Sequence, residues 1–449
     1  MTVTPSPDRM RGVARVVGLA LLAACLAPAI ALAQEAAADP PAAVDSGDTA
    51  WMLIATALVL LMTPALAFFY GGLVRSKNAL NTMMMSFISL GFVGVLWALI
   101  GYSLAFGPGN NWIGDTSMAL LRGVGLEAQG TIPELLFACF QGTFAVITAA
   151  LISGAIVERM RFPAYLAFIC LWTVLVYSPL AHWVWGGGWL FQMGALDFAG
   201  GTVVHVNAAV AAFVAVLCVG PRSDYKQTGL LPHNVPFVLL GAGLLWFGWF
   251  GFNAGSALAA SGGAALAFAT TMLAPSAALV IWSLLDLVRV GKVTAVGGAT
   301  AIVVGLVAIT PAAGFVSPMN AVLLGAIAAV PSYLMLVWRA QSSLDDSLDV
   351  IAAHGVGGTV GALLTGVFAQ EAISGVANAN GLLYGNPGQL GIQAAAVVAA
   401  IVYSGVVSYL LLKLVGLVIP LRASIEAENE GLDTNQHGEE AYMQIGSAS

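Results

Sequence analysis

Charged side chains are scarce in this chain of 449 residues, because Asp, Glu, Lys and Arg together make up only 8% of it. Soluble domains carry about 25% of these residues. Hydrophobic residues make up 59%, which predicts a polytopic membrane protein with one helical bundle rather than two or three soluble domains. The net charge of −7 argues against nucleic acid as a partner.

Cysteine and histidine are also rare, with four and five residues respectively. Cys139, Cys170 and Cys218 lie in apolar surroundings without paired spacing, which suggests neither a disulfide nor a metal site. We therefore expect no metal and no cofactor, and the chain is not predicted to be an enzyme.

The first 33 residues have the pattern of a cleaved signal peptide. Three arginines precede an apolar run that closes on Ala-Leu-Ala at residues 31–33, as at a signal-peptidase site. The alternative is a lipoprotein box ending at Cys25, but more apolar residues follow this cysteine instead of a polar linker. The mature chain would begin with a short periplasmic segment, residues 34–50.

Apolar runs of about 20 residues, long enough to cross roughly 30 Å of hydrocarbon, recur eleven times. The predicted spans are 51–73, 82–106, 134–157, 162–181, 202–219, 235–254, 264–287, 293–311, 319–338, 351–369 and 391–417. They define a transmembrane domain, residues 51–420, followed by a polar tail, residues 421–449. On composition alone this tail could be disordered.

Basic residues predict the orientation of the bundle, because all those after the signal peptide except Arg122 fall in or beside alternate connections. They are Arg75, Lys77, Arg159, Arg161, Arg222, Lys226, Arg289, Lys292, Arg339, Lys413 and Arg422. By the positive-inside rule, the mature N-terminus lies outside and the C-terminal tail inside.

Two histidines, His205 and His354, lie within apolar segments, in the fifth and tenth spans. Eleven spans divide into five, five and one, and a repeat of five spans makes two halves of opposite orientation, the inverted-repeat plan of many transporters. A buried imidazole needs a polar partner or a task. Each histidine alone could be a structural contact, whereas a pair that shares a proton suits a relay.

Aromatic residues gather at the ends of three spans. Phe140 and Phe144 are four residues apart and share a helix face, which fits either a core pair or a gate. Trp185 precedes Gly186, Gly187 and Gly188, which could place its indole over a cavity mouth, although tryptophan at this depth is often an interface anchor.

A lone acid and a lone hydroxyl lie near the same level. Asp197 precedes the fifth span and could cap that helix, lower the cost of a nearby cation, or both. In the sixth span Trp249, Phe252 and Ser256 share one face. The Ser256 hydroxyl could accept a hydrogen bond from a ligand or bond to its own backbone.

Five motifs together resemble those of the Amt/Mep/Rh ammonium transporters, in the same order and most closely the bacterial Amt branch. The resemblance extends from about Trp51 to Tyr442. The motifs are FQGTF at 140–144, AHWVWGGG at 181–188, GALDFAGGTVVH at 194–205, GWFGFNAGS at 248–256 and HGVGG at 354–358.

The resemblance implies a role for each motif residue. Phe144, Trp185 and Ser256 would form an outer ammonium site, in which aromatic faces attract the cation and the hydroxyl accepts one of its protons. Phe140 and Phe252 would be the stacked rings of a gate beneath it. The pore residues would be His205, His354 and Trp249, and the supporting residues Asp197, Gln141 and Thr310.

The resemblance also implies a homotrimer in the lipid of the bacterial inner membrane, with one pore in each subunit. Ammonium would lose a proton near the rings and cross as ammonia, with net movement of charge. The tail would help to bind a PII-type signalling protein at the cytosolic face. The alternatives are an ammonia gas channel or an ammonium sensor of the same fold, and a membrane haem protein with two axial histidines.

Overall fold

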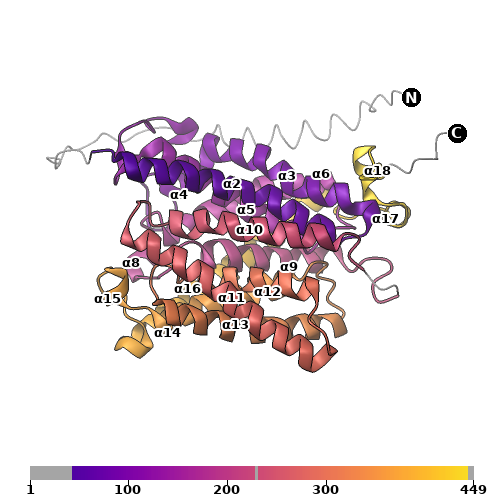
Figure 1. Ribbon diagram of the computed structural model, residues 1–449. Helices are drawn as coiled ribbons and strands as arrows, with labels where there is room; N and C mark the ends of the chain where they lie inside the picture. Colours follow the sequence, from indigo (N-terminus) through magenta and orange to yellow (C-terminus); the bar gives the residue numbers. More distant parts are fainter. Residues whose placement is uncertain (1–42, 228–230, 443–449) are drawn as a thin grey trace.

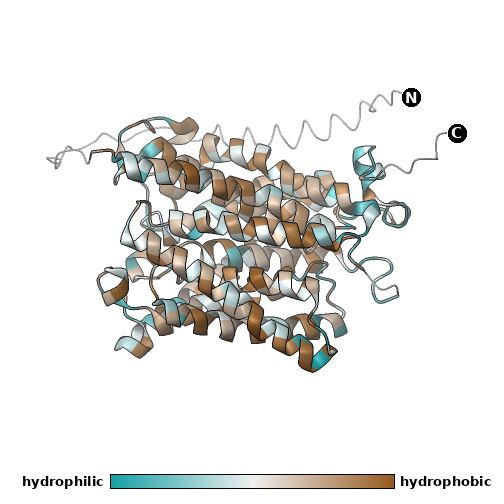
Figure 2. Ribbon diagram, in the orientation of Figure 1, coloured by the Kyte–Doolittle hydropathy of each residue, from teal (hydrophilic) through white to brown (hydrophobic). Residues whose placement is uncertain are grey.

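The computed structural model describes residues 43–227 and 231–442, and these residues form a bundle of helices that run side by side (Figure 1). The predicted signal peptide, the lipoprotein alternative at Cys25 and residues 34–42 lie outside the described residues. Hydrophobic residues predominate along the helices, and hydrophilic residues are frequent in the connections and in the last short helices, residues 425–437 (Figure 2).

Each of the eleven predicted spans coincides with a helix or with consecutive helical segments. The first five are α2 (Ser46–Leu73), α3–η2–α4 (Ala79–Leu96, Trp97–Gly101, Tyr102–Phe106), α5 (Glu134–Ser153), α6–η4–α7 (Phe162–Trp172, Thr173–Tyr177, Ser178–Val184) and η5–α9 (Gly201–Val206, Asn207–Val219). The remaining six are α10 (Val235–Gly255), α11 (Gly262–Val290), α12 (Ala295–Ile309), α13 (Pro318–Gln341), η6–α14 (Ile351–Val356, Gly357–Phe368) and α16 (Gly388–Val418).

Short elements join these helices or follow the last of them. They are η1 (Ser76–Asn78), η3 (Ala119–Leu121), the antiparallel pair β1 (Ala128–Gln129) and β2 (Ile132–Pro133), α8 (Trp189–Met193), α15 (Glu371–Ser374), η7 (Leu382–Tyr384), α17 (Ile425–Glu430) and α18 (Leu432–His437).

Ten of the described helices are long and apolar enough to cross a membrane. The exception among the predicted spans is α12, which has 15 residues and extends about 22 Å at 1.5 Å per residue. The helical membrane architecture is therefore confirmed, while the count of eleven crossings and the positions of the two termini, outside and inside, stay predictions.

Small residues allow the helices to approach closely, as expected where no hydrophobic effect drives association within lipid. On α10, a Cβ at Gly241 would lie 2.4 Å from the backbone nitrogen of Phe69 in α2. On α13, a Cβ at Gly325 would lie 2.1 Å from the carbonyl oxygen of Ala274 in α11. At each of these two glycines, the absence of a side chain allows the backbones of two neighbouring helices to come into contact.

Buried charges join the connections at one end of the bundle. The Glu158 carboxylate accepts hydrogen bonds from the guanidinium groups of Arg75 and Arg222, and Arg222 also binds Asp345 through two of its side-chain nitrogens. Burial by itself would raise the pKa of Glu158, but these two arginines lower it to about 2. Two of the basic residues that predict the inner side thus meet at one carboxylate.

The described part of the tail, up to Tyr442, packs against this charged end instead of forming the disordered segment that its composition allows. Arg422 pairs with Glu428 at 2.5 Å between Nε and Oε1. The Asp433 carboxylate accepts the backbone N–H groups of Leu80 and Asn81 at 3.0 and 2.7 Å. It thereby caps α3, whose own Asn78 makes no capping bond.

Candidate functional site

Aromatic rings from three spans meet toward the end of the bundle that lies opposite the charged connections. The rings of Phe140 and Phe144, one turn apart on α5, are 4.9 Å apart between centroids. The Phe144 ring meets the indole of Trp185 edge to face, with centroids 6.0 Å apart and planes at 88°. The edge of one ring thus faces the negative face of another, which is a favoured geometry.

The parallel ring pair differs from the one expected. Phe252 stacks on Phe144, with centroids 4.1 Å apart and planes at 17°, so the expectation that Phe140 and Phe252 stack is corrected. The reason is the antiparallel packing of α5 and α10. Phe140 lies at the level of Gly255, where a Cβ would be 2.9 Å from its ring, and one turn further along α5 Phe144 reaches the level of Phe252.

Ser256 follows the last residue of α10, beside the rings. Its hydroxyl donates a hydrogen bond to the carbonyl oxygen of Phe252, 2.8 Å away. Of the two possibilities for Ser256, the structure therefore shows the hydrogen bond to the backbone of its own helix. A hydroxyl that donates one bond still has lone pairs, so the oxygen can accept a hydrogen bond from a ligand.

Asp197 caps the segment that carries His205. Its two carboxylate oxygens accept the backbone N–H groups of Gly200, Gly201, Thr202 and Val203, at 2.6 to 3.1 Å. Burial raises the pKa of Asp197 to about 6, although the four amides act in the opposite direction. Its backbone carbonyl accepts the indole N–H of Trp185 at 2.8 Å, so the same residue orients the tryptophan.

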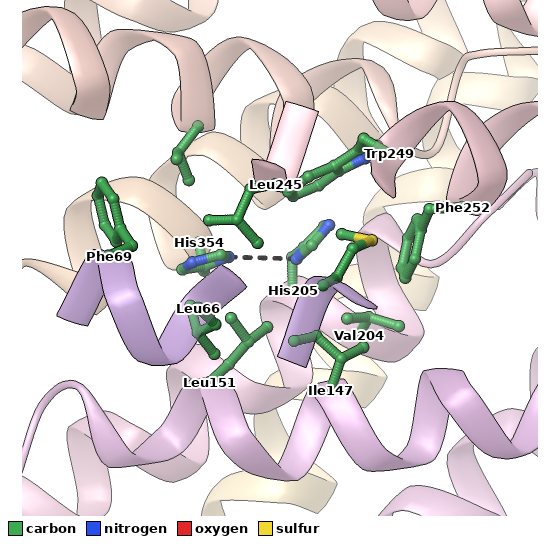
Figure 3. A pocket seen from close by; sticks show the side chains of 12 residues that line it. Leu66, Phe69, Ile147, Leu151, Val204, His205, Leu245, Trp249, Phe252 and His354 are labelled. Carbon is green, nitrogen blue, oxygen red and sulfur yellow. Dashed lines mark hydrogen bonds between the residues drawn. The ribbon is translucent and has the colours of Figure 1, made fainter. Parts of the chain in front are cut away.

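The two histidines meet in the centre of the bundle, where Nδ1 of His354 lies 3.2 Å from Nδ1 of His205 (Figure 3). Their side chains belong to residues only 3% and 2% exposed. A bond between two ring nitrogens needs one donor and one acceptor, so two neutral imidazoles satisfy it with a single proton between them. Nε2 of His205 is buried without a hydrogen-bond partner.

Trp249 supports His205 from the side. Its indole stacks on the imidazole, with centroids 5.4 Å apart and planes at 25°. The indole N–H donates to the hydroxyl of Thr310, 2.9 Å away, and that hydroxyl donates in turn to the carbonyl of Leu306. Thr310 thus holds Trp249 against His205, whereas Gln141 is buried with an unpartnered Oε1 and makes no described contact with these residues.

The histidines line a narrow cavity of about 10 Å³, close to the minimum for one water-sized molecule. Its other lining residues are apolar, and those labelled in Figure 3 are Leu66, Phe69, Ile147, Leu151, Val204, Leu245, Trp249 and Phe252. A porphyrin cannot enter this space, and the two imidazole nitrogens bond to each other, so the geometry opposes the haem alternative. The described residues also contain no group of three potential metal-ligating side chains.

Both histidines lie in π-helical turns, η5 and η6, in which the backbone winds wider than an α-helix. Such turns are rare and frequent at functional sites. Asp346 stands before η6 as Asp197 stands before η5, and its Oδ2 accepts the N–H of Ile351 at 2.7 Å. Asp346 was not among the predicted site residues, although an aspartate eight positions before each histidine was a visible sign of the repeat.

The chain matches the family model described as Ammonium Transporter Family over residues 50–442. It is 51% identical over 406 residues to a protein named ammonium transporter from Aquifex aeolicus, and the alignment covers 89% of this chain and 94% of that protein. A protein of the same name from Bacillus subtilis is 48% identical over 401 residues, with 88% and 98% covered.

Solved structures resemble the whole bundle as well. The crystal structure of Saccharomyces cerevisiae Mep2 has a TM-score of 0.80 and 36% identity, covering 85% of this chain and 88% of Mep2. The structure of a protein named Sensor Amt Protein has a TM-score of 0.81 and 31% identity, covering 87% of this chain and 98% of that one. The same fold therefore occurs in a protein that is named as a sensor.

Proposed function

Since the chain belongs to the ammonium transporter family, we propose that it binds ammonium at an outer aromatic site and passes ammonia through the cavity between His205 and His354. The observation that carries this proposal is the joining of the two imidazoles inside an otherwise apolar passage, directly beneath stacked aromatic rings. The passage suits a small neutral molecule that offers and accepts hydrogen bonds.

The outer site takes the cation. Phe144 and Trp185 supply ring faces that attract a positive charge, and Ser256 supplies a lone pair for a ligand that has only donors. Asp197, whose own carbonyl holds Trp185, lowers the electrostatic cost of a cation there. The Phe144–Phe252 stack separates this site from the cavity below.

The apolar cavity accounts for selectivity. Transferring a small ion from water into a dry medium costs about 20 kcal/mol by an idealised Born estimate. Ammonium escapes this cost by losing a proton, and potassium has none to lose. An N–H bond breaks at the rings, ammonia moves past the histidines, and the bond forms again on the inner side.

The histidine pair provides a path for the released proton. One imidazole accepts it while the proton between the two Nδ1 atoms shifts, and the other imidazole releases a proton on the inner side. Ammonia and the proton recombine there, so that each cycle moves one positive charge. Conduction of ammonia alone, with the proton left outside, is the gas-channel alternative.

The test is an ammonium jump on proteoliposomes with the current recorded on a supported membrane. We expect a sustained, protein-dependent current that potassium does not elicit. Flux without current would support the gas channel, and saturable ammonium binding without flux would support a sensor, the role for which one structural neighbour is named.

Replacing both His205 and His354 with alanine tests the relay. We expect loss of the ammonium current or loss of discrimination against potassium. The matched control is His233→Asn, because His233 lies outside the cavity and bonds to the Val74 carbonyl and Tyr442. A double variant that behaves as the wild type contradicts the proposal.

The resemblance further supports a bacterial inner-membrane homotrimer with a cleaved signal peptide. We also propose that the tail, residues 421–449, contributes to a cytosolic surface for a PII-type protein, because its described part packs directly on the charged connections. Binding of a PII protein to the purified transporter should fall when the chain is truncated after Ala423, and unchanged binding would contradict this role.

A further inference from the structure

The connection from Gly194 to Gly200 determines the shape of the outer site, although none of it is helical. Its residue Asp197 holds the indole of Trp185 with a backbone carbonyl and caps η5 with its carboxylate. A connection of this kind keeps its form only if its own backbone groups find partners. The partners of Leu196, the residue before Asp197, are therefore decisive.

Leu196 bonds to a side chain from the last helix, α16. The Gln393 Oε1 atom accepts the N–H of Leu196, and its Nε2 donates to the carbonyl of the same residue, both at 2.7 Å. The same Nε2 donates to the carbonyl of Ala362 in α14, 3.1 Å away. Gln393 thus pairs with Leu196 as a neighbouring β-strand would, and it is only 1% exposed.

The orientation of this amide follows from its partners. Reversing it would set two N–H groups against the N–H of Leu196 and an oxygen against two carbonyl oxygens. Gln389, one turn earlier on α16, donates to the carbonyl of Gly194 at 2.9 Å. Every donor and acceptor of the Gln393 side chain is therefore used.

A close helix contact brings Gln393 within reach of the connection. At Gly366 of α14, a Cβ would lie 2.8 Å from the Cα of Leu390 and 2.9 Å from the Cγ of Gln393. Any larger side chain at Gly366 would push α16 away. The last helix lies outside the five-plus-five repeat, yet it reaches the residue next to Asp197.

We propose that Gln393 is a positioning residue for the outer cation site: it fixes the backbone of Leu196, and thereby the Asp197 carbonyl that orients Trp185. This inference rests on the proposed function, because it assigns Gln393 to the site where ammonium binds. Its effect is on the affinity for the cation and not on the passage of ammonia, since Gln393 is not among the residues that line the histidine cavity.

The experiment compares wild type and Gln393→Met by ammonium-dependent current over a range of concentrations. Methionine keeps the length of the side chain and removes its hydrogen bonds. We expect the half-saturating ammonium concentration to rise about three- to tenfold, the size expected for a net loss of one or two hydrogen bonds. The maximal current per folded trimer should stay within about twofold.

Two further variants distinguish an effect on the cation site from a general loss of stability. Gln393→Asn keeps an amide but is one methylene too short to bond both groups of Leu196, so the same rise is expected. Ser408→Ala is the matched control, because it removes a buried bond between α16 and the indole of Trp172 far from the connection. A rise of equal size in Ser408→Ala overturns the proposal.

A double-mutant cycle tests the path through Trp185. Trp185→Phe removes the indole N–H that binds the Asp197 carbonyl, so adding Gln393→Met should raise the half-saturating concentration little further. Fully multiplicative effects would contradict the path. If the wild type itself gives no ammonium response, the proposed function fails. If it responds and Gln393→Met keeps the wild-type half-saturation, only the role of Gln393 fails.

Discussion

His205 and His354 each lie in a six-residue π-helical turn, η5 and η6, and each turn follows an aspartate eight positions before its histidine. The two turns enter the bundle from opposite ends, as an inverted repeat requires. Asp197 lies beside Trp185, at the end of the bundle away from the charged network, whereas Asp346 follows Asp345 of that network.

The surroundings of the two turns differ more than their backbones. Asp197 accepts four amides, and its histidine is flanked by Trp249 and Phe252. Asp346 accepts the amide of Ile351, and its other oxygen is buried without a partner. The two halves thus share one way of placing an imidazole, while the aromatic rings that we propose for cation binding lie on the side of η5.

The largest effect should separate the two aspartates. Asp197→Ala leaves four buried amides without an acceptor, each at a cost of about 1–3 kcal/mol, so we expect little folded protein. Asp346→Ala removes fewer bonds and should yield a folded but less stable protein. Expression yield and thermal unfolding of the two purified variants measure this difference, and equal losses would mean that the two caps are equivalent.

A smaller effect concerns the support of Trp249. Thr310→Val keeps the shape and removes the acceptor of the indole N–H, which should cost about 1–3 kcal/mol of unfolding free energy and reduce the maximal current. Thr365→Val is the matched control, because this buried hydroxyl bonds only to the carbonyl of Gly361 in its own helix. We expect a smaller loss of stability in this control, as measured by thermal unfolding, and the reverse order would argue against the support of Trp249 by Thr310.

The smallest effect is a dependence on pH at the outer cap. With a pKa of about 6, roughly a quarter of the Asp197 carboxyl groups stay ionised at pH 5.5. The half-saturating ammonium concentration of the wild type should therefore rise by up to about fourfold between pH 7.5 and pH 5.5. In Asp197→Asn it should already be high at pH 7.5 and change little, and a similar rise in both proteins would assign the titration to another group.

Hydropathy predicted the helical bundle, because polar groups are costly in lipid. The orientation inferred from the basic residues stays a prediction. The motifs singled out the two histidines, Trp249 and Phe252, which line the cavity, but not most of its other lining residues. They did not predict that Phe144 rather than Phe140 stacks on Phe252, because that pairing depends on the level at which α5 passes α10. Gly255 determines where along α10 the ring of Phe140 lies. No local sequence pattern shows that these two residues are neighbours.

The π-helical turns and the role of Gln393 could not be predicted from the sequence either. One additional residue per turn leaves no signature in the spacing of apolar residues within an apolar segment. Gln393 looks like an isolated polar residue in a long span, and its partner Leu196 is 197 positions away. The spacing of Asp346 and His354, in contrast, could have been found by comparing the two halves.

The cap that Asp433 provides for α3 has a consequence for the biosynthesis of the protein. Leu80 and Asn81 belong to the second of the long helices, while their acceptor follows 353 positions after Leu80. During synthesis the start of this early helix stays uncapped until nearly the whole chain has left the ribosome. A prematurely terminated chain would expose those amides at the membrane surface, where proteolytic surveillance could distinguish it from a finished molecule.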